Sequence, residues 1–82
     1  MPAKHSPVLI YWRPGCGFCA RLRARLGPVA EKATWVNIWD DQEAAAFVRE
    51  ANGGSETVPT VVLDGIPLTN PDPRVVKDRL AA

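Results

Sequence analysis

The only two cysteines of this 82-residue chain, Cys16 and Cys19, lie between a strand-like run and a helix-like run. A fold for this chain must therefore end a strand beside the start of a helix, where two thiols at this spacing can form a disulfide within one helical turn. A thiol at a helix N-terminus faces unpaired backbone N–H groups and the positive end of the helix dipole, and both favour the thiolate. Because the thiolate is the form that attacks disulfides, the pair predicts a dithiol–disulfide redox centre.

Two other uses of a cysteine pair fit this sequence less well. A disulfide that closes a four-residue loop stabilises a fold by only about 2 kcal/mol in the chain-entropy treatment, and here it would join segments that are already adjacent. A structural zinc ion needs about four ligands. The chain offers the two cysteines, the remote His5 and scattered carboxylates. We therefore expect no metal site within one chain.

Length and composition predict one small globular domain. The chain has 46% hydrophobic residues and a formal net charge of +1, which favours a packed core over a nucleic-acid-binding surface. No apolar run approaches a membrane span, and no secretory signal is recognisable. We therefore expect the protein in the cytoplasm, where cysteine pairs stay reduced. We also expect a monomer. Residues 1–7 are expected to form a loose arm, and residues 8–82 the domain.

Residue patterns in the first half predict two strands separated by a helix. The apolar run 8–12 suits a strand buried on both faces, and the alternation over 34–39 predicts a second strand. A helix should begin at Cys16 and weaken or end at Gly27-Pro28. Its apolar stripe is expected from Phe18, Leu22, Leu26 and Val29.

The middle of the chain predicts a second helix followed by a hairpin. Asp40 and Glu43 form a capping-box pattern, and Asn52-Gly53-Gly54 should end the helix. Its apolar stripe is expected from Ala44, Phe47, Val48 and Ala51. A strand should begin after Pro59, and Asp64-Gly65 predicts a tight turn into an edge strand.

The last segment predicts a third helix that begins at Asp72-Pro73, with an N-cap followed by a proline at the first helical position. Its apolar side is expected from Val75, Val76 and Leu80. The resulting order is β-α-β-α-β-β-α, and the first strand–helix–strand unit must be parallel and right-handed. The sequence therefore predicts an α/β fold, with a four-stranded mixed sheet flanked by three helices.

The chain carries four short motifs: Tyr11, Cys16-Gly17-Phe18-Cys19, Thr57-Val58-Pro59 and Asp64-Gly65. Together they resemble the glutaredoxin branch of the thioredoxin superfamily. The cysteine pair alone is a weak motif, but with Thr-Val-Pro and then Asp-Gly at these spacings it is a strong one. A more specific similarity to the actinobacterial mycoredoxins lies in the runs 43–48, 52–54, 57–61 and 68–71. The resemblance covers roughly residues 8–80 and implies the thioredoxin fold.

The resemblance also implies roles for individual residues. Cys16 matches the family's nucleophile, and Cys19 matches its resolving cysteine. Pro59 matches a cis-proline whose loop faces the active site, and the backbone of Val58 would pair with an extended thiol substrate. Thr57 lies beside this loop. The positions that match a loop holding the low-molecular-weight thiol are Thr69 and Asn70.

Four residues beside the cysteines carry two interpretations each. Trp12 either lines the site or packs in the core. Phe18 faces either the core or the substrate. Arg13 and Arg21 either stabilise a thiolate or are solvated side chains. One departure from the mycoredoxin pattern is Gly15, which stands where a bulky aromatic residue is usual.

The predicted function is reduction of protein disulfides or protein–mycothiol mixed disulfides by Cys16, without a metal or organic cofactor. The expected partners are oxidised or mycothiolated proteins and a low-molecular-weight thiol, mycothiol or glutathione. Either a second small thiol or Cys19 would complete the cycle. Three alternatives stay open: an electron donor recharged by thioredoxin reductase, an iron–sulfur scaffold in which two chains each supply Cys16 and small thiols complete the ligand shell, and a thiol-independent binding module.

Overall fold

Strands and helices alternate along the computed structural model, which describes residues 7–82. In chain order the elements are β1 (Val8–Trp12), α1 (Gly17–Leu26), the 3-10 helix η2 (Gly27–Lys32), β2 (Thr34–Asn37), α2 (Gln42–Ala51), β3 (Thr60–Leu63), β4 (Ile66–Thr69) and α3 (Pro73–Ala81). The predicted order of strands and α-helices is confirmed. The one addition is η2, which continues the chain after α1 ends at the Gly27-Pro28 break.

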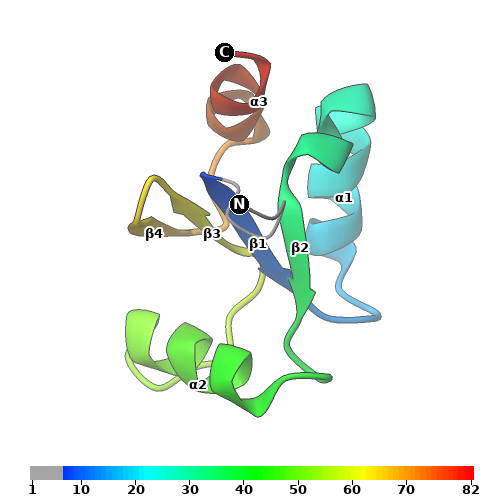
Figure 1. The fold of residues 1–82 in the computed structure, drawn as a ribbon. Coiled ribbons are helices and arrows are strands. Elements are labelled where there is room, and N and C mark those ends of the chain that lie inside the picture. The colour runs from blue at the N-terminus through cyan, green and yellow to red at the C-terminus, as the bar shows by residue number, and fades with distance from the viewer. Residues whose placement is uncertain (1–6) are drawn as a thin grey trace.

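The four strands form one mixed sheet in the order β2-β1-β3-β4. Strand β1 pairs parallel with β2 and antiparallel with β3, and β4 pairs antiparallel with β3. Helices α1 and α3 lie on one face of the sheet and α2 lies on the other (Figure 1). The predicted fold class, a four-stranded mixed sheet flanked by three helices, is therefore confirmed.

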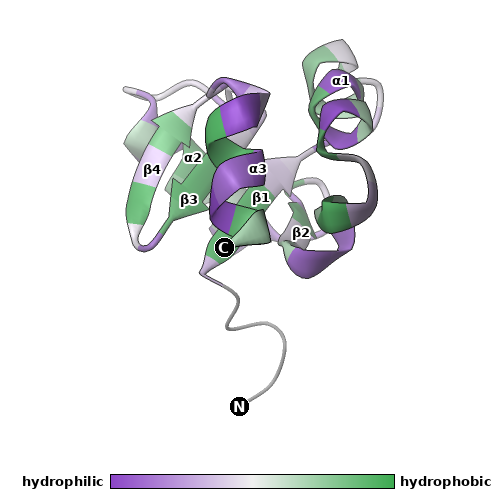
Figure 2. Ribbon diagram, turned by 90° about the horizontal axis from the view of Figure 1, so that it is seen from above, coloured by the Kyte–Doolittle hydropathy of each residue, from purple (hydrophilic) through white to green (hydrophobic). Residues whose placement is uncertain are grey.

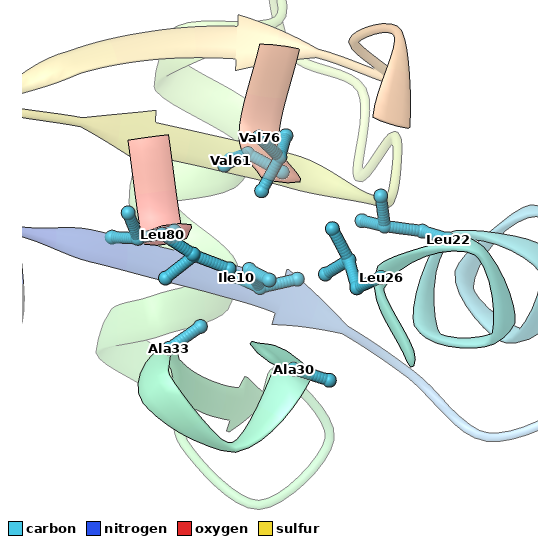
Figure 3. Close-up of a cluster of buried hydrophobic side chains, with 9 residues drawn as sticks. Ile10, Leu22, Leu26, Ala30, Ala33, Val61, Val76 and Leu80 are labelled. Atoms are coloured by element: carbon cyan, nitrogen blue, oxygen red, sulfur yellow. The ribbon is translucent and has the colours of Figure 1, made fainter. Parts of the chain in front are cut away.

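The larger core cluster fills the space between the sheet and helices α1 and α3. Ile10 and Val61 come from the two central strands, and both are fully buried. Figure 3 shows them converging with Leu26 of α1 and Val76 of α3. In Figure 2, α3 carries hydrophilic residues on its outer side, whereas β1 and β3 are largely hydrophobic. Burial of these side chains fixes α1, and with it the start of that helix at the cysteine pair.

A second, smaller cluster joins α2 to the cysteine pair on the other face of the sheet. It consists of Cys19, Ile38, Ala44, Ala45, Val48 and Val58. The cluster therefore contains one of the two cysteines, the first residue after β2 and the residue before Pro59. Packing of α2 thus holds three segments of the predicted site against one another.

Strand β2 and helix α2 differ from their predicted boundaries. Strand β2 ends at Asn37 instead of Trp39, because Asn37 closes a turn: its carbonyl accepts from Asp40 N at 3.1 Å and its Oδ1 accepts from Trp39 N at 2.9 Å. The capping box of Asp40 and Glu43 is wrong. Asp41 is the N-cap, and its Oδ1 accepts from the backbone N–H groups of Glu43 and Ala44.

Three predicted apolar positions, one on each α-helix, face solvent instead of the core: Phe18, Ala51 and Val75. Leu22 and Leu26 of α1 are buried as predicted, but the Phe18 side chain, which the sequence left open between core and substrate, is 59% exposed. On α3, Val76 and Leu80 are buried, whereas Val75 is about half exposed. Phe18 and Val75 lie in the first turns of α1 and α3, and Ala51 is the last residue of α2.

The predicted loose arm covers residues 1–7. Residues 1–6, which include His5, lie outside the described residues. Pro7 itself is held, since its carbonyl accepts from Asp64 N at 2.9 Å. Within residues 7–82, no helix is long and apolar enough to cross a membrane.

The corrected helix start gives a matched pair of variants. Asp41→Ala should lower the free energy of unfolding by about 1 kcal/mol, because it removes the acceptor for two backbone N–H groups at the start of α2. Asp40→Ala, one residue earlier, should change it by less than about 0.5 kcal/mol. Urea denaturation of both variants measures the difference. Equal losses, or a larger loss at Asp40, would contradict the assignment of the cap.

Candidate active site

Four loops meet at one end of the sheet because of the strand register. Trp12 at the end of β1 pairs with Asn37 at the end of β2, and Tyr11 pairs with Thr60 at the start of β3. The loop after β4 joins them, since Asn70 N donates to the carbonyl of Pro59 at 2.8 Å. In Figure 1 the loop before α1 and the turn after β2 lie at this end of the sheet. All the predicted site residues therefore come to one region.

Cys16 is the N-cap of α1, and its backbone is extended, with φ −88° and ψ 110°. Its Sγ accepts from the backbone N–H of Cys19 at 3.2 Å and, as a thiol, donates to the carbonyl of Val58 at 3.6 Å. The first turn of α1 contains no acidic residue. A negative charge on this sulfur would therefore face a backbone donor and the positive end of the helix dipole.

Cys19 lies one turn further along α1 and is buried, with 4% of its surface exposed. Burial, and after it the hydrogen bond with Cys16, raise the pKa of the Cys19 thiol to about 12, although a hydrogen bond with the backbone of Arg13 acts in the opposite direction. The two thiols are both free and differ in environment. Cys16 is partly exposed and is the sulfur that a disulfide substrate can reach, whereas Cys19 stays a neutral thiol near neutral pH.

A cleft of about 250 Å³ runs along the side of α1 and reaches both cysteines. Trp12 lines this cleft, so it borders the site while also packing against the smaller core cluster. Trp35 forms part of the wall, with the Arg23 guanidinium stacked over its ring at 4.7 Å. The cleft thus presents two indoles and two guanidinium groups, including that of Arg13, beside the redox pair.

The loop of residues 57–59, here called the Val58 loop, faces Cys16 and is held by the start of β3 and the end of α2. The Val58–Pro59 peptide bond is cis, the isomer that the family resemblance implies. The hydroxyl of Thr60 donates to the carbonyl of Thr57 at 2.7 Å and accepts from Asn52 Nδ2 at 3.0 Å. The backbone of Thr57 and Val58 is therefore held in place from the start of β3 and the end of α2.

The predicted thiol-binding loop after β4 splits into two parts. The hydroxyl of Thr69 donates to Asn52 Oδ1, so it contributes to the same network that fixes the Val58 loop. Asn70 lies instead beside Phe18 in a separate hollow of about 220 Å³ between the first turn of α1 and the start of α3. Phe18 therefore borders the predicted substrate region, and the interpretation of Phe18 as a core residue is wrong.

The sequence prediction missed the contacts that Asn52 and Arg13 make in this geometry. Asn52 was assigned only to the helix end, yet it ties α2 to both Thr60 and Thr69. Arg13 donates from Nη1 to the carbonyl of Glu56 at 3.3 Å, so it bridges the cysteine loop and the Val58 loop. The sequence carried no local signal for these contacts, because Arg13 and Glu56 are 43 residues apart.

Gly15, the departure from the mycoredoxin pattern, has a backbone reason. Its φ is 78°, in the left-handed region that glycine adopts without strain and a bulky residue does not. A Cβ at this position would meet no atom within 4 Å. The loop thus depends on the conformational freedom of Gly15 and not on its small size.

A metal site of protein side chains is not formed within residues 7–82, where no three His, Cys, Asp or Glu residues come close enough to hold an ion. What this geometry does support is thiol chemistry at one reachable sulfur with a buried neighbour.

Comparison with known proteins decides the family. The glutaredoxin family model matches residues 8–66, which include the cysteine pair, the Val58 loop and the hairpin turn. The chain belongs to the glutaredoxin family. Two proteins from strains of Mycobacterium tuberculosis, both named as glutaredoxins, are 43% identical over 76 residues, which span 92% of this chain and 90% of theirs.

The fold of this glutaredoxin also matches a solved one. The crystal structure of the holo form of a glutaredoxin from Populus tremula x tremuloides has a TM-score of 0.65 and 24% sequence identity, and the match covers 94% of this chain and 78% of that one. Glutaredoxins are thiol–disulfide oxidoreductases that act on thiol-modified proteins and low-molecular-weight thiols. The chain is therefore a redox enzyme of this general class.

Proposed function

We propose that this glutaredoxin reduces mixed disulfides between proteins and mycothiol in the cytoplasm, and that Cys16 alone carries the thiol exchange. The observation that carries the proposal is the contrast between the two cysteines. Cys16 Sγ is partly exposed opposite the carbonyl of Val58, whereas Cys19 is buried and its pKa is raised to about 12. Only the first sulfur is both within reach of a disulfide substrate and placed at the N-terminus of α1.

The proposed exchange proceeds in two steps. The Cys16 thiolate attacks the mycothiol sulfur of the mixed disulfide, the bond to the protein sulfur breaks, and the protein leaves as a thiolate that takes up a proton. Cys16 is then disulfide-bonded to mycothiol. A second mycothiol thiolate attacks the bound mycothiol sulfur, which releases mycothiol disulfide and restores Cys16. The second mycothiol supplies the electrons, so the protein needs no further reductant of its own.

Selection of the mycothiol sulfur for attack requires the mixed disulfide to lie in line with Cys16 Sγ. The Val58 loop supports this alignment, because its backbone faces the sulfur at 3.6 Å and is held by Thr60 and Asn52. An extended cysteinyl group can pair with the backbone of Val58 as a short added strand. Arg13 donates to the carbonyl of Glu56 and so ties the cysteine loop to the segment before Val58.

The preference for mycothiol over glutathione rests on charge. Glutathione-dependent glutaredoxins often hold the glutathione amino group with charged residues at the loop after β4, which here would involve Asp72. The Asp72 carboxylate already caps α3 and pairs with Arg74 at 2.9 Å, and these contacts lower the pKa of Asp72 to about 2. Its charge is thus balanced within the protein. The similarity to mycobacterial relatives agrees with the mycoredoxin-like runs of the sequence.

A paired turnover assay tests the proposal. One mycothiolated and one glutathionylated peptide of the same sequence are reduced, the first with mycothiol and its reductase, the second with glutathione and its reductase. We expect turnover with mycothiol to be at least about tenfold faster, equivalent to about 1.4 kcal/mol of preference. A several-fold higher rate with glutathione would contradict the mycothiol assignment, and recharging by thioredoxin reductase alone would favour the electron-donor alternative.

A further inference from the structure

A tryptophan projects from the active-site end of the sheet without a part in the core. Trp39 is 64% exposed, although its neighbour Ile38 is buried. The turn that carries it is fixed by Asn37, which accepts from Trp39 N and from Asp40 N. The backbone is thus held and the indole is presented to solvent. An indole this exposed contributes little to the core, so we looked for a role in the residues around it.

Trp39 forms one wall of a surface hollow of about 500 Å³, here named the Trp39 hollow. The hollow lies between the turn after β2, one side of α2 and the segment before the Val58 loop. Its lining residues are Ile38, Trp39, Gln42, Ala45, Arg49 and Glu56. The walls therefore combine an aromatic face with an amide, a guanidinium and a carboxylate.

The Trp39 hollow lies next to the reactive sulfur. Glu56 is two residues before Val58, whose carbonyl is 3.6 Å from Cys16 Sγ. Two residues of extended chain span at most about 7 Å, so the hollow begins within about 10 Å of the sulfur. On the other wall, Ile38 N donates to the carbonyl of Trp12 at 2.9 Å, beside the cysteine loop. A group attached to Cys16 can reach the hollow along the Val58 loop.

The chemistry of the walls suits a neutral polyol better than a charged group. The apolar face of a sugar ring packs on an indole, and its hydroxyls can both donate to and accept from polar side chains such as Gln42. Arg49 and Glu56 form an ion pair with each other, so the hollow offers neither an unpaired cation nor an unpaired anion of that pair. Binding pockets commonly combine aromatic walls with a few polar groups in this way.

We propose that the Trp39 hollow binds the sugar head group of a glycosylated cysteine thiol while that thiol is disulfide-bonded to Cys16. The proposal rests on the proposed function, since mycothiol is a thiol of this class. The disulfide bond, one cysteinyl unit and its amide bond together span about 7 Å, so a head group attached to them covers the rest of the path of about 10 Å from Cys16 to the hollow. The head group then stacks on Trp39 and meets the side chains of Gln42 and Glu56.

The test compares two mixed disulfides that differ only in the head group. Mycothiol and N-acetylcysteine are each attached to the same peptide, and kcat/KM is measured for the native protein and for Trp39→Ala. We expect Trp39→Ala to lose about tenfold on the mycothiol substrate and less than about twofold on the N-acetylcysteine substrate. Trp39→Phe, which keeps an aromatic ring, should recover most of the loss. Val75→Ala, an exposed apolar residue on α3, should match the native protein on both substrates.

The outcomes separate this proposal from the function on which it rests. Equal losses on both substrates, or no loss on either, would contradict the binding of the head group in the Trp39 hollow, while the preference of the native protein for mycothiol would stand. A native protein that prefers glutathionylated peptide would overturn both. A supporting measurement uses Cys19→Ser with mycothiol attached to Cys16: its tryptophan emission should differ from that of the N-acetylcysteine adduct, and Trp39→Phe should abolish the difference.

Discussion

Serine at position 16 should abolish the reduction of mixed disulfides, with turnover falling by more than about a thousandfold, because no other thiol can form the bond to the small thiol. Cys19→Ser should keep turnover within about threefold of the native rate, since the second mycothiol and not Cys19 completes the cycle. Coupled NADPH consumption with a mycothiolated peptide measures both variants. If the two are equally inactive, exchange through Cys16 alone is wrong.

The same contrast gives a pH dependence with a definite sign. Burial raises the pKa of Cys19 to about 12, so below that pH its thiolate fraction grows about tenfold for each pH unit. Attack of Cys19 on a small thiol bound to Cys16 should accelerate in step as the pH rises from about 7 to 9. Release of mycothiol from the Cys16 adduct, without added thiol, is followed by acid quench and mass spectrometry. A release rate that does not change with pH would contradict the assigned burial of Cys19.

Replacing Ile10 with alanine should lower the free energy of unfolding by about 3 kcal/mol, since a fully buried isoleucine leaves a cavity when truncated. Ile10 lies in the central strand β1, is 0% exposed, and contacts the cluster formed with α1 and α3. That loss is a large part of the 5–15 kcal/mol typical of small domains. The melting temperature of this 82-residue protein should fall by more than about 10 °C.

The chain offers a matched control for this variant. Ile66 is also an isoleucine in a strand, but β4 is an edge strand and Ile66 is 63% exposed. Ile66→Ala should change the free energy of unfolding by less than about 1 kcal/mol. Urea denaturation of the reduced proteins measures both variants. Similar losses at the two positions would show that the core is not where the structure places it.

The sequence determined the features that depend on near neighbours. Alternation of residue types and the apolar run 8–12 specify strands, and Asp72-Pro73 specifies the start of α3, which is where the structure has it. The spacing of Cys16 and Cys19 specifies two sulfurs one helical turn apart. These features were predictable because each rests on backbone geometry within a few residues.

Boundaries were less predictable where two neighbouring residues can serve the same purpose. Asp40 and Asp41 are both able to cap α2, and the choice fell to Asp41 because Asn37 closes a turn over Asp40. The alternation of residue types continues to Trp39 and so predicted a longer strand, but the turn that Asn37 closes ends β2 at Asn37. A residue pattern fixes which side chains are apolar, but the turn that the backbone can close decides where the strand stops.

Only the tertiary structure decided which distant segments meet at the site. The sheet order brings the ends of β1 and β2 beside the start of β3, and so places Arg13 against Glu56 and Cys16 against Val58. Packing against α2 buries Cys19 and leaves Cys16 at the surface. The sequence thus specified two thiols at a helix start, but their different exposure comes from contacts between residues far apart in the chain.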